Sequence, residues 1–346
     1  MPGSNEPPED PAAEPPAEPA SERVHEPIGV EILEGALGAL VHAHDIPTPN
    51  GAIACWTYVS EGLLAHGHAE LVFTLRRNPD EAVEQAPDEP FRLFTTVYQL
   101  AATGRPIGPG AIPDLGEERF LGHHLLFVRA QPLPGVALPE PCLAVVLLAD
   151  DELRAVRAFG VARVLARMAE ASAYYPFPPW ADLRRQGLAL ERTFERSVLA
   201  RLPRASAPGV RVSASGERVT LSARRSELPA WEDRLAQIPA QAPFALLTGP
   251  DPGADGCLVW VPGQKQVEVI APPGSDAARI CGSFLVFVPG QAEVGGKVLE
   301  DGFALELTDA AWQAIRRALA AGDELSLEAT RDAMSFALTW RDPEDL

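Results

Sequence analysis

The chain has 346 residues, 46% of them hydrophobic, and a formal net charge of −19 at pH 7. It is long enough for one large core or for two sub-domains. An acid excess of this size argues against nucleic acid and anionic lipid as partners, because each phosphate contact needs an Arg or Lys. The chain has no apolar run near the length of a membrane span and no basic, apolar start typical of a signal peptide. We therefore expect a cytoplasmic protein that does not bind membranes.

An acidic, proline-rich segment opens the chain. Residues 1–23 hold seven prolines and six acids against one base, Arg23. Such a composition cannot bury enough apolar area to offset the entropy of ordering. We predict a disordered tail over residues 1–26, which leaves a charge of about −14 on the remainder.

The next stretch predicts alternating helices and strands. Apolar residues at three-four spacing predict a helix over residues 28–42 and another over 91–101, and Gly104 ends the second one. Apolar runs predict strands at residues 125–128 and 142–150, the latter buried on both faces. Asp150 or Asp151 is expected to cap a helix that follows this strand.

The prolines of the segment YYPFPPW end that helix, and the pattern then changes. Short strands are predicted at residues 210–212, 219–221, 258–261, 267–270, 284–288 and 303–307. Helices are predicted at residues 227–237 and 309–321, the second with Thr308 as its cap and Gly322 at its end. The result is an α+β fold of two mixed sub-domains, residues 27–185 and 208–342, with predominantly antiparallel sheets flanked by helices.

The segment from Cys55 to Arg77 carries the most specific pattern. An aromatic strand and a glycine turn lead into a strand in which Leu71, Phe73 and Leu75 alternate with residues of the other face. Its landmarks are Trp56, Tyr58, Glu61, Gly62, Gly67 and Glu70. This order resembles the start of the C-terminal domain of the Smad anchor for receptor activation and endofin family, where Trp-x-Tyr-Val-x-(Asp/Glu)-Gly-Leu precedes Gly-x-x-Glu and an apolar strand.

Further landmarks follow in the same order as in that family. Gly122 closes a Phe-Leu-Gly motif, the residues at 163–180 resemble a helix that ends in Tyr-Pro-x-Pro, and Glu300, Asp301 and Gly302 resemble a Glu-Asp-Gly motif. The resemblance spans residues 53–340 and implies a stand-alone relative, and structural roles are expected for these landmarks. The richness in Ala, Arg and Pro is typical of a bacterial source with high GC content. The Ser-Glu-Gly-Leu turn at 60–63 also resembles, more faintly, suppressor-of-fused-like domains, some bacterial members of which are thought to neutralise toxins.

No residue pattern in the sequence predicts a metal, a cofactor or a catalytic centre. The histidine pairs at 42/44, 66/68 and 123/124 lack the spacing of a ligand set, and surface positions are expected for them. The four cysteines (Cys55, Cys142, Cys257, Cys281) are interpreted as small buried apolar residues. An acid–base pair that uses Glu61 and Asp301 remains open as an alternative, although turn or capping roles are favoured.

The aromatic loop before residue 181 is the candidate contact surface. Core packing is favoured for Trp56 and Tyr58, whereas rings in a proline-rich loop are harder to bury and typically anchor protein interfaces. The expected contact residues are Tyr174, Tyr175, Phe177 and Trp180.

We therefore expect a non-enzymatic protein-interaction module of scaffold or adaptor type, with a protein partner and no nucleic acid. The net charge favours a basic partner. Two alternatives remain: an immunity-type protein that neutralises a toxin, and a hydrolase or transferase that uses the acids near Glu61 and Asp301.

Overall fold

The structure is a computed structural model that describes residues 26–78, 80–81, 85–114, 119–190, 194–239, 241–330 and 333–341. The predicted disordered tail lies outside these residues except for Glu26. In the described residues the fold is α+β, with three mostly antiparallel sheets and five α-helices. None of these helices is both long and apolar enough to span a membrane.

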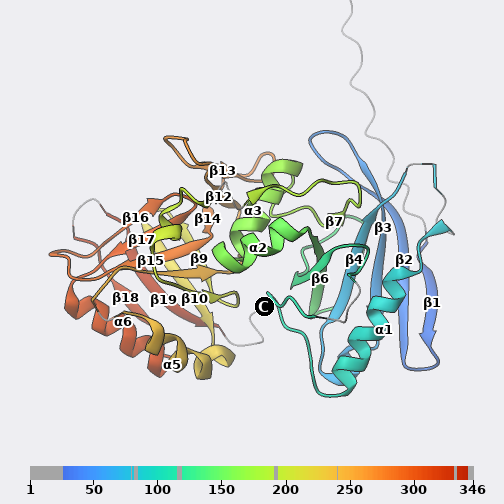
Figure 1. The fold of residues 1–346 in the computed structure, drawn as a ribbon, viewed down its shortest axis with the longest axis horizontal. Coiled ribbons are helices and arrows are strands. Elements are labelled where there is room, and N and C mark those ends of the chain that lie inside the picture. Colours follow the sequence, from blue (N-terminus) through green and yellow to red (C-terminus); the bar gives the residue numbers. More distant parts are fainter. Residues whose placement is uncertain are drawn as a thin grey trace, which may run out of the picture.

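The first sheet occupies the N-terminal half of the chain (Figure 1). Its strands are β1 (Ile28–Leu33), β2 (Leu37–Ile46), β3 (Ile53–Glu61), β4 (Glu70–Arg76), β5 (His124–Arg129), β6 (Cys142–Leu148) and β7 (Trp180–Ala181). Their order is β1-β2-β3-β4-β6-β5, with β7 paired to β4. The pairs β4–β6 and β4–β7 are parallel and the others antiparallel. The strand β5 is therefore one edge of this sheet.

Two further sheets form the C-terminal half. The strands of the second sheet, in spatial order, are β13 (Glu268–Ile270), β12 (Gly256–Val259), β14 (Arg279–Gly282), β9 (Arg211–Ser215), β10 (Arg218–Arg224), β19 (Ser335–Arg341) and β18 (Leu325–Leu327). The strands of the third sheet, in the same sense, are β16 (Gly295–Leu299), β17 (Gly302–Glu306), β15 (Phe284–Val288), β11 (Phe244–Thr248) and β8 (Arg204–Ala207). Sequence patterns predicted β9, β10, β12, β13, β15 and β17, whereas β8, β11, β14, β16, β18 and β19 were missed.

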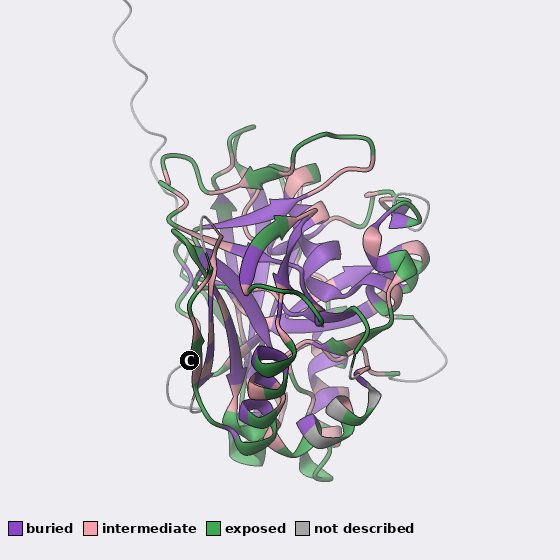
Figure 2. Cartoon of the chain, turned by 90° about the vertical axis from the view of Figure 1, so that its left-hand side faces the viewer, coloured by how far each residue is buried: buried purple, intermediate pink, exposed green. Residues whose placement is uncertain are grey.

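The helices cover the sheets in layers. They are α1 (Glu89–Ala102), α2 (Asp150–Phe159), α3 (Val161–Ser172), α5 (Leu228–Gln237) and α6 (Asp309–Ala321), with short 3₁₀ turns η1 (Leu64–His66), η3 (Val198–Arg201) and η4 (Arg225–Glu227). In Figure 1, α2 and α3 lie between the N-terminal sheet and the C-terminal sheets. Figure 2 shows that the buried residues concentrate in the sheets and on the inner faces of the helices.

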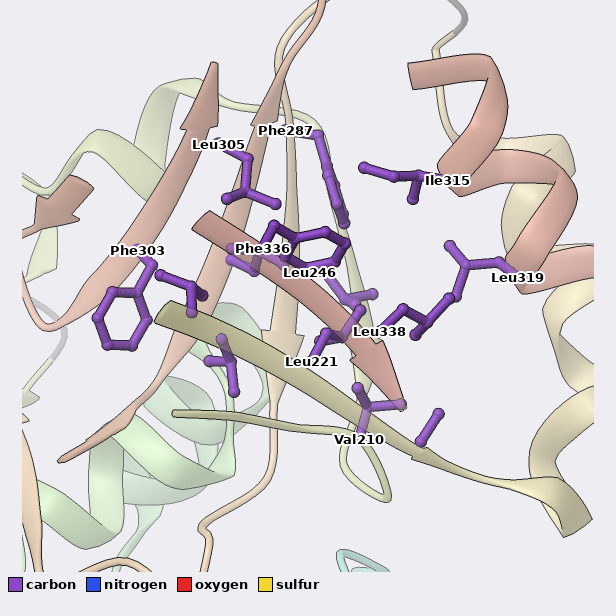
Figure 3. Close-up of a cluster of buried hydrophobic side chains, with 14 of the residues drawn as sticks. Val210, Leu221, Leu246, Phe287, Phe303, Leu305, Ile315, Leu319, Phe336 and Leu338 are labelled. Atoms are coloured by element: carbon purple, nitrogen blue, oxygen red, sulfur yellow. The ribbon is translucent and has the colours of Figure 1, made fainter. Parts of the chain in front are cut away.

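Side chains along the strands of the third sheet alternate between its two faces, which explains this layering. In β11, Phe244 and Leu246 belong to a core shared with the second sheet and α6, while Ala245 and Leu247 belong to a core shared with α2, α3 and the N-terminal sheet. Figure 3 shows the first of these cores, where Ile315 and Leu319 of α6 point toward the strands. The second core contains residues of both predicted sub-domains, and the division into 27–185 and 208–342 stays a prediction.

The predicted helix over residues 28–42 is wrong. These residues form β1 and the start of β2, joined by a turn at Gly35, whose φ is +62°. Leu37, Ala39 and Val41 are all buried in the core against α1, as period-two alternation requires. The sequence of residues 28–46 fits both the three-four spacing of a helix and the period-two alternation of a strand. Pairing of β2 with β3 over nine residues favours the strand.

The predicted helix after β6 is two helices. Gly160, with φ +94°, separates α2 from α3, and its Cα lies against Leu247, so that a Cβ there would be 3.2 Å from the leucine. The predicted Asp cap is also wrong, because Ala149 precedes the first turn and its N–H donates to Glu152 Oε2 at 2.9 Å. For α6, Thr308 Oγ1 accepts from Ala311 N–H and Gly322 closes the helix, as predicted.

Candidate functional site

The aromatic loop that was expected to be exposed is largely packed. Phe177 is 2% exposed and Trp180 9% exposed. Trp180 packs edge-on against Tyr174, with ring centroids 5.0 Å apart, and Tyr175 donates its hydroxyl hydrogen to Ala254 O at 2.5 Å. The expected exposure of Phe177 and Trp180 is therefore wrong, because the loop folds back onto the cores. A contact role for Tyr174 and Tyr175, which are half-buried, stays a prediction.

The landmark Glu70 organises the turn between β3 and β4. Its carboxylate accepts hydrogen bonds from Ser60 Oγ at 2.5 Å, Gly62 N–H at 2.9 Å and Leu64 N–H at 3.1 Å. Gly62 has φ +122°, and a Cβ there would lie 2.3 Å from Ala36 O, so only glycine fits. The carboxylate therefore accepts hydrogen bonds from two backbone amides and a buried hydroxyl of a tight turn.

The other landmarks lie in turns and cores. Trp56 and Tyr58 are buried in the core against α1, and Tyr58 donates to Pro87 O at 3.0 Å. Glu61 is exposed at the end of β3, and Gly67 and Gly122 are turn residues with positive φ. Gly302 packs on Phe284, whose carbonyl oxygen would lie 2.5 Å from a Cβ at this position.

A buried arginine joins α3 to the turn between β16 and β17. Arg163, fully buried, donates to Ser197 Oγ at 2.8 Å, Glu300 Oε2 at 3.0 Å and Asp301 Oδ1 at 2.5 Å. Its guanidinium also lies 4.4 Å from the centroid of the Phe194 ring. Burial raises the pKa of the Asp301 carboxyl, and Arg163 opposes this rise. The two carboxylates thus neutralise a buried cation that connects the two halves of the chain.

The histidines and cysteines do not assemble into a site. The surface positions expected for His42, His44 and His68 are wrong, since all three are buried, and His44 Nε2 lies 2.8 Å from Thr57 Oγ1. Burial raises the pKa of Cys55 and of Cys257 to about 12 each, so these thiols stay protonated near neutral pH. Within the described ranges, no group of three or more His, Cys, Asp or Glu side chains is arranged to hold a metal ion.

A groove separates the end of β5 and the loop after it from the C-terminal half. Its volume is about 800 Å³. The lining residues are Ala69, Ile107, Pro109, Arg129, Ala130, Gln131, Pro132, Leu133, Val136, Leu138, Pro139, Glu140, Pro141, Cys142, Leu143, Arg224 and Pro252. We call this cavity the β5 groove. Neither Glu61 nor Asp301 lines it, and it contains none of the aromatic residues predicted for partner contact.

Arginines gather at one end of the β5 groove. A smaller cavity of about 20 Å³ adjoins the β5 groove at this end. The two cavities share the lining residues Pro109, Arg129, Arg224 and Pro252, and Arg211 lines the smaller one. Burial lowers the pKa of both Arg211 and Arg224, and the nearby charge of Arg341 lowers them further. The arginines come from the ends of β5, β10 and β19 and from the start of β9.

At the arginine end of the β5 groove, the N-terminal and C-terminal halves of the chain are in close contact. Gly110, with φ +83°, packs against Pro208, so a Cβ at residue 110 would lie 2.4 Å from Pro208 Cβ. The loop at 110–111 also pairs with β5, since Gly110 N–H donates to Phe127 O and Phe127 N–H donates to Ala111 O. The glycine-rich loop from Gly108 therefore positions one wall of the groove.

Sequence reasoning missed the β5 groove because its walls come from separate segments of the chain. One local signal was present: Arg129, Arg224 and Arg341 each directly follow an apolar strand run, LLFV, VTLSA and FALTW. A charged residue at a strand end is equally typical of a solvent-exposed strand terminus. Only the tertiary arrangement shows that these arginines lie at a cavity.

The solved structures similar to this chain include two that contain suppressor of fused. The sequence matches no family model and no curated protein. One structure, described as the Sufu-Fu complex, is 19% identical and covers 48% of this chain and 86% of its own, with a TM-score of 0.36. The other, Drosophila Suppressor of Fused, is 13% identical and covers 87% of this chain and 88% of its own, with a TM-score of 0.34.

Both similar structures contain suppressor of fused, in agreement with the fainter of the two sequence resemblances. Neither supports the resemblance to the Smad anchor for receptor activation. At these identities and TM-scores, neither a fold nor a residue role is transferred to this chain.

Proposed function

We propose that the chain is a non-enzymatic protein-interaction module that binds an extended segment of a protein partner in the β5 groove. The observation that carries this proposal is the edge of β5 beside the groove, which is open at Arg129. Strand alternation directs the amide and carbonyl of Arg129 to the same outer edge as those of Phe127. Phe127 is covered by the loop at 110–111, whereas Arg129 has no backbone partner on that edge among the described residues.

An extended segment can bind there by adding a strand to the sheet. Main-chain hydrogen bonds to an exposed edge supply affinity, and pockets beside the edge supply specificity. Five prolines line the groove, Pro109, Pro132, Pro139, Pro141 and Pro252. Because proline fixes its own φ, such walls are held in shape before binding, which lowers the entropic cost of association.

The enzyme alternative finds less support in the arrangement of the acids. Asp301 and Glu300 are engaged with Arg163 and Ser197, and Glu70 is engaged with the β3–β4 turn. These three carboxylates therefore have structural tasks, and Glu61 is exposed at the end of β3 and does not line the β5 groove. Neutralisation of a toxin remains one form that the proposed interaction could take.

The test blocks the groove without changing charge. Ala130, which lines the groove, is replaced by Trp, and the exposed Ala320 of α6 is replaced by Trp as the matched control. Partners captured from native lysate are identified, purified and titrated against all three proteins. We expect Ala320→Trp to bind like the wild type and Ala130→Trp to lose at least tenfold in affinity. Equal affinity of the partner for Ala130→Trp and the wild type would exclude the groove as its binding site.

A further inference from the structure

The arginine end of the β5 groove is an unusual feature in a chain with a net charge of −19. Arg129 and Arg224 line both the groove and the adjoining small cavity, and Arg211 lines the latter. Arg224 and Arg341 are register partners on the neighbouring parallel strands β10 and β19, so they lie side by side. Four like charges from three regions of the sequence thus converge on one place.

The acids nearby neutralise only part of this cluster. Asp251 is buried beneath it, 3.5 Å from Arg211 Nη1, and also pairs with Arg279. Glu227, which lies near Arg224, pairs with Arg234 at 2.9 Å, and Glu140 is an exposed residue of the groove lining. Among the described residues, neither Arg129 nor Arg224 has a side-chain hydrogen bond or an ion pair, and the Nε of each is buried without a partner.

Arg129 and Arg224 are half-buried, and partly buried guanidinium groups without partners are costly. Their N–H donors lose water, and like charges repel in a medium of reduced dielectric constant. The lowered pKa values of Arg211 and Arg224 express the same cost. An arrangement of this kind is stabilised when an anion accepts the free hydrogen bonds, and arginine presents its donors in a fork that matches a carboxylate or a phosphate.

We infer that Arg129, Arg211 and Arg224 form a binding site for an oxyanion, a carboxylate or phosphate group whose remaining bonds extend into the β5 groove. The small cavity alone holds little more than water, so the anionic group sits at its junction with the larger groove, where Arg129 and Arg224 border both. The group is either free in solution or carried on the segment that the proposed function places in the groove. In the second case an acidic or phosphorylated residue of the partner fixes its register.

The test uses three probes at low ionic strength: inorganic phosphate, succinate and an acetylated hexaglutamate peptide, with hexaglutamine as the uncharged counterpart. Binding is measured by titration calorimetry on the full chain. The site variant is Arg129→Gln with Arg224→Gln. The control is Arg105→Gln with Arg157→Gln, which removes the same charge from two exposed arginines outside the groove.

We expect saturable binding of at least one oxyanion to the wild type and to the control, and a loss of about tenfold or more in the site variant. Binding of phosphate or succinate assigns the site to free anions, and selective binding of hexaglutamate assigns it to an acidic segment. A second variant, Arg129→Lys with Arg224→Lys, keeps the charge and should weaken binding because the fork is lost.

The inference is overturned if no probe binds the wild type saturably, or if the site variant and the control bind equally. These measurements use no partner protein. Failure of the oxyanion site and failure of the proposed partner binding are therefore separate results.

Discussion

Arg163 and the half-buried arginines of the β5 groove differ in whether the chain itself supplies ion-pair partners for their charge. Arg163 has two carboxylates, a hydroxyl and an aromatic ring around it, all supplied by the chain itself. Arg129 and Arg224, at the groove, are half-buried and have no ion pair among the described residues. The Nε atom is buried without a partner in all three arginines, so the contrast lies in the ion pairs. A buried cation paired with carboxylates contributes to the fold, whereas unpaired cations at a cavity indicate a ligand from outside.

The largest expected effect is at Arg163. Its replacement by Ala leaves the buried Asp301 and the half-buried Glu300 without a cation, so we expect the free energy of unfolding to fall by about 3–5 kcal/mol. Urea denaturation gives this value, with Arg157→Ala, an exposed arginine of α2, as the control expected to change it by less than about 1 kcal/mol. A loss below about 1 kcal/mol for Arg163→Ala would show that its ion pairs are not structural.

A smaller effect is expected where the two halves meet below the groove. Gly110→Ala introduces both a strained positive φ and a clash with Pro208, and we expect a destabilisation of about 2–3 kcal/mol. Gly104→Ala has a similar φ, +75°, and no atom within 4 Å of the added Cβ, so it reports the backbone cost alone. If the two variants lose equal stability in urea denaturation, Gly110 and Pro208 are not in contact in solution.

The buried histidines of β2 predict a pH dependence of stability. Burial lowers the pKa of His42 and of His44 in the folded state below the ordinary value of 6.5, and the charge of His42 lowers the pKa of His44 further. The unfolded chain then binds more protons as the pH falls below 6.5, so acid favours unfolding. Between pH 7.5 and 5.5 we expect a loss of roughly 1–2 kcal/mol.

Substitution of both residues by Gln should flatten this pH profile, measured as urea midpoints across the range. His66→Gln, at an exposed position on η1, should leave the profile as steep as in the wild type. A wild-type stability that is constant between pH 7.5 and 5.5 would contradict the burial of these rings.

The smallest expected effect on stability is at the groove arginines. The Arg129→Gln, Arg224→Gln variant removes donors that have no partner in the fold, so its melting temperature in the absence of oxyanions should stay within a few degrees of the wild type. A much larger fall in melting temperature would show that these arginines stabilise the fold, as Arg163 does.

The elements that the sequence predicted correctly are those whose local signals agree. For α6, a Thr cap, an apolar stripe through Trp312 and Ile315 and a closing Gly322 all indicate the same helix. For residues 28–42, two periodicities compete, and only the pairing of β2 with β3 decides between them. Tertiary contacts overrode the local pattern there.

The candidate site shows the same limit more strongly. Arg129 and Arg224 are separated by 95 positions, and each sits at the end of an ordinary apolar strand. Large rings in a proline-rich loop predicted a contact surface, yet Phe177 and Trp180 pack in buried hydrophobic clusters. Burial and convergence of charge depend on the folded arrangement, which the sequence pattern does not contain.

The most direct test of the account is hydrogen exchange of the full chain with and without its isolated partner. If the partner adds a strand at β5, the amides of the non-proline residues in 129–133 and 138–143 should gain protection on binding. The amides of β12 and β13, at the far edge of the second sheet, should not change. Protection confined to other surfaces, with the amides at the β5 groove unchanged, would contradict the central claim that this groove is the functional surface.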